Sequence, residues 1–410
     1  MRPDSSPAQP GVAVPAGDRR TTALRFIVLL GLVSLLADLT YEGARSISGP
    51  YLALLGASGA VVGLTAGLGE SLGYGLRLVS GLLADRTRRY WALTISGYAL
   101  NLLAVPLLAL AGRWEVAALL IVLERVGKAL RTPARDAMLA HATAHVGHGR
   151  GFGLHEALDQ VGALTGPLVV AAVLAGTGDY RPAFAVLLAP ALLALLVLLL
   201  ARWLYPQPQA LAPTLPPLAT QGLPRAYWLY LGAVVLVAAG TVDFALVAYH
   251  LARTAAVPAA TIPLLYALAM GIDALAALAA GALFDRVGLR TLLLSTLLGA
   301  LAAPLIFLAS QSLPLLLLGV ALWGVGLGAQ ESIWRAAIAI MVPPARRGSA
   351  YGLFNAGYGG AWFLGSALIG LLYDRTLAVM VLFSAGIQLA ALPVLARLAR
   401  RPGQPTTAEV

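Results

Sequence analysis

Apolar residues occur in long runs along most of the chain, and short polar segments separate them. Roughly twelve runs of about 20 residues recur between residues 24 and 396, and a helix needs this length to cross a bilayer. The run at 191–200 is uniformly apolar and lacks the alternation of a transmembrane β-strand. Because helices satisfy their own backbone hydrogen bonds in lipid, the pattern predicts an all-α integral membrane protein.

The polar breaks, together with Gly and Pro, predict where each transmembrane helix begins and ends. The first four expected helices lie at 24–50, 60–84, 91–110 and 119–139. The fifth begins near residue 151 and passes Gly166-Pro167, and the sixth ends near residue 204. The last six lie at 226–250, 261–284, 290–309, 313–342, 348–372 and 377–396. We expect Gly49-Pro50 to end the first helix and Pro133 to bend or end the fourth.

A Pro-rich, nearly uncharged segment at 205–224 divides the chain near its middle. It is too polar to span a membrane, so it predicts a linker between two domains. The expected organisation is a disordered tail at 1–22, a six-helix bundle at 23–204, a linker at 205–225, a second six-helix bundle at 226–400 and a tail at 401–410.

Charged residues make up only 11% of the 410 residues, against about 25% in a soluble domain. Arg gathers in alternate connections: Arg19 and Arg20; Arg86, Arg88 and Arg89; Arg150; Arg225; Arg286 and Arg290; Arg346 and Arg347; Arg397, Arg400 and Arg401. This positive-inside pattern places both termini in the cytoplasm and predicts a multi-pass protein of the plasma (inner) membrane. The net charge of +10 is not gathered in one soluble patch, which argues against a nucleic-acid partner.

The two halves of the chain repeat each other. The segment Gly81–Arg86 (GLLADR) returns 200 residues later as Gly281–Arg286 (GALFDR), and Gly151–Ala157 (GFGLHEA) resembles Ala350–Ala356 (AYGLFNA). Tandem six-helix repeats place a substrate site at their interface, near the middle of the bilayer.

The repeated loop carries a family resemblance. Gly81, Leu83, Asp85, Arg86 and Arg89 fit the pattern G-x-L-x-D-R-x-G-R of the major facilitator superfamily (MFS), with Arg88 where the family prefers Gly. The second copy keeps Gly281, Leu283, Asp285, Arg286 and Gly288. The resemblance extends from about residue 24 to residue 400. It implies two pseudo-symmetric six-helix halves around a central cavity, and transport by alternating access.

The resemblance also implies a latch that closes the cytoplasmic side; the alternative is that these loop residues only set topology and cap helices. The expected gate residues are Gly81, Asp85, Arg86, Arg89, Arg131, Arg135, Asp136, Gly281, Asp285 and Arg286.

The predicted helix at 119–139 carries several charges, each costing roughly 3 kcal/mol at membrane depth. They form either a structural ion-pair network or a site that handles substrate or ions. Arg125 resembles the Arg of a family pattern, L-x-x-R-x-x-Q-G, that is linked to proton coupling, although Lys128 and Ala129 replace its Gln and Gly. Lys128 is the only Lys in the chain.

Other polar residues fall within the predicted helices, where they would face a protein interior. The expected substrate- and proton-coupling residues are Asp38, Tyr41, Glu42, Glu124, Arg125, Lys128, Glu156, Asp159, Asp243, Glu331, Arg335 and Asn355. We interpret Glu70 and Arg77 as structural. His155 is either a proton relay or a solvated side chain. Trp323, Trp334 and Trp362 either line the cavity or pack between helices.

Gly162, Gly166 and Pro167 resemble the antiporter signature G-x-x-x-G-P-x-x-G-G, with Val170 and Ala171 in place of its last two glycines. This partial match favours export by antiport.

The sequence therefore predicts a secondary transporter, and not an enzyme, that exports a small organic or drug-like solute using protons or sodium. Uptake of an organic anion or another polar metabolite by proton symport is the alternative, and a sensor or lipid-flipping protein of the same fold is the alternative class. No nucleotide-binding loop, metal-ligand spacing or nucleophile elbow is present, so we expect no cofactor and no metal. The expected partners are a small-molecule substrate, the coupling ion and the lipid bilayer, with the protein as a monomer.

Overall fold

The computed structural model describes residues 16–143, 146–206, 222–343 and 346–400, and these residues form helices and connections without a strand. The first half contains α1 (Ala16–Leu54), α2 (Gly59–Thr87), α3 (Tyr90–Leu107), η1 (Leu108–Leu110), α4 (Trp114–Thr143), α5 (His148–Thr177), α6 (Tyr180–Ala185) and α7 (Leu188–Leu204). The second half contains α8 (Arg225–Gly240), α9 (Phe244–Arg253), α10 (Thr261–Val287), α11 (Arg290–Ala300), α12 (Ala302–Leu308), α13 (Leu313–Met341), α14 (Arg347–Arg375), α15 (Leu377–Ala390) and α16 (Leu392–Ala399).

Ten helical segments of the described chain are long and apolar enough to cross a membrane, with α6–α7, α8–α9, α11–α12 and α15–α16 each forming one span. Helices α2 and α4 are also long enough, but charged side chains interrupt their apolar stretches. Adding these two to the ten completes the twelve predicted spans. The chain therefore has the architecture of a multi-pass membrane protein.

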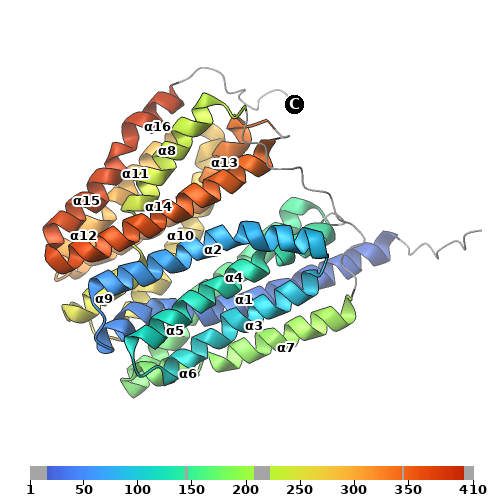
Figure 1. Cartoon of the computed structure of the whole chain (residues 1–410), viewed down its shortest axis with the longest axis horizontal. Coiled ribbons are helices and arrows are strands. Elements are labelled where there is room, and N and C mark those ends of the chain that lie inside the picture. The colour runs from blue at the N-terminus through green and yellow to red at the C-terminus, as the bar shows by residue number, and fades with distance from the viewer. Residues whose placement is uncertain (1–15, 144–145, 207–221, 344–345, 401–410) are drawn as a thin grey trace, which may run out of the picture.

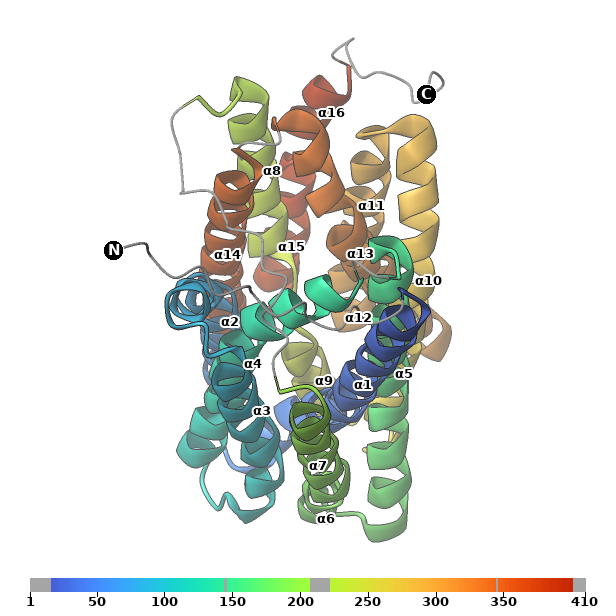
Figure 2. The ribbon, with the colours of Figure 1, turned by 90° about the vertical axis from the view of Figure 1, so that its right-hand side faces the viewer.

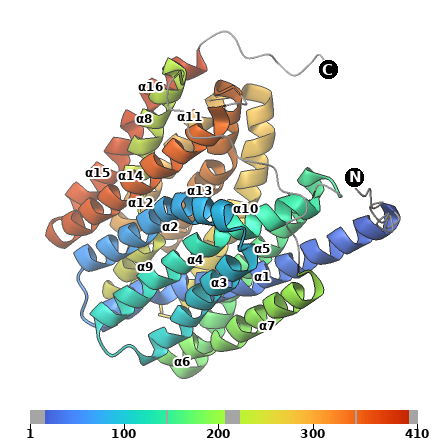
Figure 3. The same ribbon diagram turned by 45° about the vertical axis from the view of Figure 1, so that its right-hand side comes forward.

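The two halves form separate bundles that lean against each other (Figure 1). Helices α2 and α14, α5 and α10, and α1 and α9 make the main contacts between them. In Figure 1 the bundles meet on the left and diverge toward the upper right, with the start of α1 at the right and the end of α16 at the top. We call the diverging end, where α1 begins and α16 ends, the open face, and the end where α2 begins and α14 ends the closed face. Figures 2 and 3 show α2 beside α14 and α5 beside α10.

Small residues let α2 and α14 approach closely on the closed face. A side chain at Gly63 would overlap the carbonyl oxygen of Ser366, and a Cβ at Gly67 would lie 3.0 Å from the carbonyl oxygen of Phe363. Such contacts between backbones are typical of small-residue interfaces in membrane helices.

The predicted end of the first helix at Gly49-Pro50 was wrong, and the fourth helix does not end at Pro133. Helix α1 continues through Gly49-Pro50 to Leu54, and the absence of a side chain at Gly49 lets α1 cross α9 against the Ala245 carbonyl. Helix α4 continues through Pro133 to Thr143. Pro133 cannot donate a hydrogen bond to the carbonyl of residue 129, but Ser80 Oγ of α2 donates to it at 2.8 Å, so the helix persists.

The predicted helix at 226–250 is also broken, because residues 241–243 separate α8 from α9. Asp243 caps α9 by accepting a hydrogen bond from the Ala245 N–H at 2.8 Å. The freed carbonyl of Gly240 accepts hydrogen bonds from Ser384 and Gln388, at 2.6 and 2.9 Å. Side chains from α15 thus satisfy backbone groups that lipid could not.

Candidate functional site

A cavity of about 1290 Å³ lies between the halves, and α1, α2, α4, α5, α10, α13 and α14 line it. It extends from Glu42 to Asp85 and Asp136, near the ends of α2 and α4 on the open face. An adjoining lobe of about 790 Å³ shares Lys128, Glu156 and other residues with it. The space between the halves is therefore a cavity toward the open face and is filled by packed helices toward the closed face.

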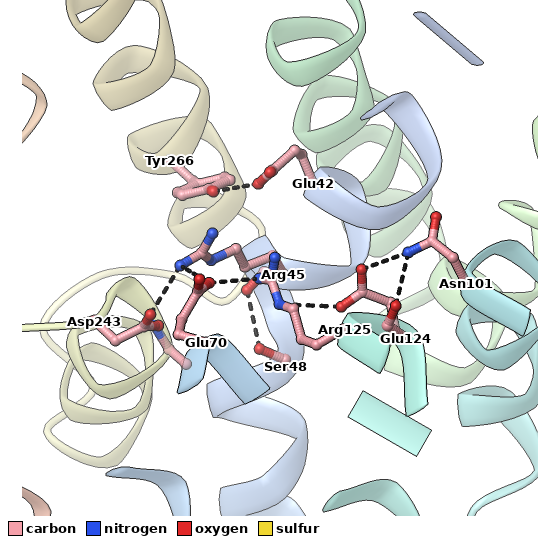
Figure 4. A network of polar contacts seen from close by, with 10 residues as sticks. Glu42, Arg45, Ser48, Glu70, Asn101, Glu124, Arg125, Asp243 and Tyr266 are labelled. Atoms are coloured by element: carbon pink, nitrogen blue, oxygen red, sulfur yellow. Dashed lines mark hydrogen bonds and ion pairs between the residues drawn. The ribbon is translucent and has the colours of Figure 1, made fainter. Parts of the chain in front are cut away.

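A chain of ion pairs crosses the floor of this cavity (Figure 4). Arg125 pairs with Glu124 at 3.1 Å and with Glu70 at 3.4 Å. Arg45 pairs with Glu70 at 3.3 Å and with Asp243 of the other half at 2.8 Å. The amide of Asn101 donates to the Glu124 carboxylate at 2.7 Å. Each of these carboxylates thus has a partner, as buried charges require.

Further contacts join the halves toward the closed face. The Tyr266 hydroxyl of α10 donates to Glu42 of α1 (Figure 4), and the Tyr249 hydroxyl donates to the Ala57 carbonyl at 3.1 Å. The Asp374 carboxylate, at the end of α14, accepts hydrogen bonds from the Gly59 and Ala60 N–H groups at 2.8 and 2.7 Å. These two N–H groups begin α2, so Asp374 caps a helix of the other half.

Two cations of α4 lie against aromatic rings, without a carboxylate within 4.0 Å in the part of the chain that the structure describes. Lys128 Nζ lies 4.0 Å from the ring centre of Tyr41, and the Arg131 guanidinium lies 4.1 Å from that of Tyr98. Asp38 accepts a hydrogen bond from the Tyr41 hydroxyl at 2.6 Å. Cation–π contacts thus hold these cations at the cavity wall.

Nearer the open face, α4 and α5 form a second polar cluster. Arg135 pairs with Asp136 at 2.8 Å and donates to Ser34 Oγ at 3.0 Å. His155 Nε2 lies 3.2 Å from Ser34 Oγ and 3.7 Å from Asp159. His155 is buried, so the interpretation of this side chain as solvated was wrong.

The structure brings most of the predicted coupling residues to one cavity. Those that line it are Asp38, Tyr41, Glu42, Lys128, Glu156, Asp159, Glu331, Arg335 and Asn355. Glu124, Arg125 and Asp243 instead belong to the ion-pair chain at the cavity floor, although Arg125 also borders the second lobe.

The predicted gate residues separate into two groups. Those that line the cavity are Gly81, Asp85, Arg86, Arg131, Arg135 and Asp136. Arg89, Gly281, Asp285 and Arg286 do not line it. On α5, side chains at Gly162 and Gly166 would overlap the carbonyl oxygens of Leu35 and Leu39, so these glycines seat α5 on α1.

The sequence analysis missed Tyr266, Asp374 and an aromatic wall of the second lobe. The wall consists of Tyr74, Trp334, Phe354 and Tyr358, with the Tyr74 and Tyr358 ring centres 5.1 Å apart. Trp334 was considered for the cavity and does line this lobe, whereas Trp323 packs internally and donates to the Val242 carbonyl at 2.8 Å. No sequence motif marks Asp374 or Tyr266, because their partners lie in the other half.

Comparisons with known proteins agree with this architecture. The family model described as Major Facilitator Superfamily matches residues 30–239 and 228–410. An uncharacterized protein of Mycobacterium tuberculosis is 46% identical over 380 residues, which cover 90% of this chain and 92% of that protein. An uncharacterized MFS-type transporter of Methanocaldococcus jannaschii is 31% identical over 140 residues, covering 34% of this chain and 35% of that protein.

Among solved structures, the nucleoside transporter NupG superimposes with a TM-score of 0.70 at 13% identity, covering 92% of this chain and 99% of that chain. At this identity the likeness concerns the fold, and it places the two six-helix halves in the family's arrangement. The match of the family model to both halves carries the assignment. The chain belongs to the Major Facilitator Superfamily and is a multi-pass secondary transporter, not an enzyme.

Proposed function

We propose that the protein works by alternating access as a proton-coupled exporter of a small polar organic solute. One observation carries this proposal: a large charged cavity is open at one face, and contacts between the halves close the other face. The moving units are the bundles at 23–204 and 226–400, and most of the linker between them (207–221) lies outside the described residues. The Arg-rich connections support a cytoplasmic open face in the plasma membrane.

The carboxylates of the cavity fall into two classes, and one class suits proton exchange. Glu70 and Glu124 are already partners of Arg side chains. Glu156, Asp273 and Glu331 line the cavity, and none of the ion pairs in the described chain includes them. We assign proton exchange to this second class, because a proton there breaks no ion pair.

The register of α2 against α14 supports the gate assignment. Gly59 lies at Asp374, Gly63 at Gly370 and Gly67 at Ser366, so the two helices are antiparallel. The same register places Asp85 opposite residue 348, one residue after α14 begins. We assign Asp85 as the cap of α14 when the open face closes, with the Asp374 contact released at the other end.

Export as the direction rests on the helix-5 motif of Gly162, Gly166 and Pro167. A second direction, uptake of an organic anion by symport, draws support from Lys128 and Arg131, which no carboxylate within 4.0 Å neutralises in the described chain. Antiport moves solute and protons in opposite directions, whereas symport moves them together.

A proteoliposome assay tests the proposal. Purified protein is reconstituted with a pH-sensitive dye inside the vesicles, a library of small polar solutes is added outside, and solute and proton movements are recorded together. We expect at least one solute to move protons outward as it enters, and Glu331→Gln to abolish this exchange. Glu115→Gln is the matched control, because Glu115 is exposed and lies outside the cavity. Solute transport that no imposed ion gradient alters would refute coupling.

A further inference from the structure

The cavity presents hydrogen-bond donors on one wall and acceptors on another. Arg77 of α2 and Lys128 and Arg131 of α4 provide donors. Asp273 of α10 and Glu331 of α13 provide acceptors from the other half. Each half also contributes groups of the other sign, among them Asp38, Glu42 and Arg335, so the two walls are distinguished by which buried groups lack a hydrogen-bond partner.

The donor wall contains buried groups without partners. Only 1% of Arg131 is exposed, yet its Nε and Nη1 atoms have no hydrogen-bond partner, and Arg77 Nε also lacks one. The rings of Tyr41 and Tyr98 fix Lys128 and Arg131 in position. A ring face accepts no strong hydrogen bond, so these N–H groups remain available for an anionic oxygen of a ligand.

The acceptor wall also contains buried groups without partners, and here they are oxygen atoms that lack a donor. Only 2% of Asp273 is exposed, and its Oδ1 atom has no partner; neither does Oε1 of Gln330, which borders the second lobe. The charges that act on Asp273 are those of Glu331, Glu42 and Glu156, all of which are carboxylates. Leaving a buried acceptor without a donor is unfavourable, so this wall favours a ligand that donates hydrogen bonds.

Aromatic rings adjoin the acceptor wall. Phe354 and Tyr358 stack at 5.8 Å between ring centres, and Trp334 lies 5.6 Å from Tyr358. Together with Tyr74 they form one side of the lobe that Glu331 borders. Such a surface suits the apolar or aromatic body of a ligand whose ammonium group reaches a carboxylate.

We propose that the cavity binds a zwitterionic organic solute, with its anionic group at Lys128 and Arg131 and its ammonium group at Asp273 and Glu331. This proposal rests on the transport function inferred above. An anion alone would leave the acceptor wall unsatisfied, and a cation alone would leave the donor wall unsatisfied. A proton and the ammonium group would compete for the same carboxylates, which provides a physical basis for their exchange.

Three matched probes test this proposal: 4-(aminomethyl)phenylacetate, which is a zwitterion, 4-methylphenylacetate, which is an anion, and 4-methylbenzylamine, which is a cation at neutral pH. Binding to the purified protein is measured from the ligand-dependent rise in melting temperature. We expect the zwitterion to bind about ten- to a hundred-fold more tightly than either single-charge probe, because it makes one more charged hydrogen bond.

Two variants test which residues bind the anionic group and which bind the ammonium group of the probe. Lys128→Met should remove the preference for the zwitterion over the cation, and Glu331→Gln should remove its preference over the anion. A merely structural role would weaken all probes alike, and the melting temperature of each unliganded variant reports its folding. Equal binding of a single-charge probe, or no binding of any probe, would overturn the zwitterion proposal. Solute-driven proton flux in proteoliposomes would then still decide the transport proposal by itself.

Discussion

The two ends of the α2–α14 pair each carry an Asp near a helix end, but only the Asp on the closed face caps the partner helix in this structure. On the closed face, Asp374 near the end of α14 caps the first N–H groups of α2, at 2.8 and 2.7 Å. On the open face, Asp85 near the end of α2 lines the cavity. If each half moves as a bundle, as we propose, engaging one cap would withdraw the other. On this proposal, alternation would require only two equivalent contacts that exclude each other, not two kinds of gate.

The chain offers a direct way to measure this alternation, because it contains no Cys. Spin labels on introduced Cys residues at Arg150 and Arg290 would report the open face. Labels at Gly176 and Ala259 would report the closed face. All four positions are exposed and lie outside α2 and α14: Arg150 and Gly176 belong to α5, Arg290 begins α11, and Ala259 lies two residues before α10.

The largest effect is expected from Arg45→Gln. Arg45 joins Glu70 of its own half to Asp243 of the other, and its loss leaves two buried carboxylates without this partner. Breaking a buried pair costs about 3–5 kcal/mol, and water entering an opened face would relieve that cost. We expect the labels on the closed face to separate and the melting temperature to fall.

Arg113→Gln is the control for Arg45→Gln, because the Arg113–Glu115 pair is exposed and solvent screens it, so its loss should change stability little. The double variant Arg45→Gln/Asp243→Asn should recover part of the closed population. An Arg45 variant whose closed face keeps wild-type distances would show that the ion pairs do not hold this face together.

Gly63→Ala should have the next largest effect. Its added methyl group would overlap the Ser366 carbonyl, which is backbone and cannot move aside easily. Overpacking costs about 1–3 kcal/mol, and here the cost applies only while α2 and α14 are in contact. The labels on the closed face should therefore move apart. The matched control is Gly73→Ala on the same helix, where an added methyl group meets nothing within 4 Å.

Asp374→Asn should have a smaller effect. It removes a charged cap from α2, and a lost cap costs about 0.5–2 kcal/mol. We expect the closed face to open partly, with little change in melting temperature. Asp179→Asn is the control, because Asp179 is an exposed cap of α6 that accepts a hydrogen bond from the Arg181 N–H within its own half. Equal label distances in the two variants would remove Asp374 from the gate.

The sequence predicted the positions of the spans well, but it did not predict the hydrogen bonds that let a helix continue past Pro133 or break after Gly240. Ten of the spans in the described chain are recognisable by hydropathy, because lipid leaves a helix few alternatives to a long apolar run, whereas charges interrupt the apolar stretches of α2 and α4. Hydropathy could not foresee that Ser80 would satisfy the carbonyl that Pro133 leaves free, or that Ser384 and Gln388 would support the break after Gly240. Those donors come from helices whose neighbours are set only by the packed fold.

The candidate site was predictable in its residue types and not in its pairings. Charges at membrane depth identified Asp38, Lys128 and Glu331 as cavity residues. Within α4, Arg125 joins the ion-pair chain, whereas Lys128 lines the cavity. This difference depends on their partners in α2 and α1, which the sequence does not identify. The role of Asp374 depends on a helix that begins more than 300 residues earlier.

The smallest effect, and the one with the opposite sign, is expected from Asp85→Asn. In this structure Asp85 lines the cavity and belongs to none of the ion pairs of the described chain, so its loss leaves the open-face state intact. In the proposed alternate state, the α2–α14 register would bring Asp85 to the start of α14, so that state should lose about 0.5–2 kcal/mol. Label distances should therefore move little, while the minor population in that alternate state becomes smaller. Combining Asp85→Asn with Asp374→Asn should restore the wild-type ratio of the two states, because each change weakens one of them. If the double variant instead matches Asp374→Asn alone, the two ends are not equivalent and Asp85 serves only the topology of the loop.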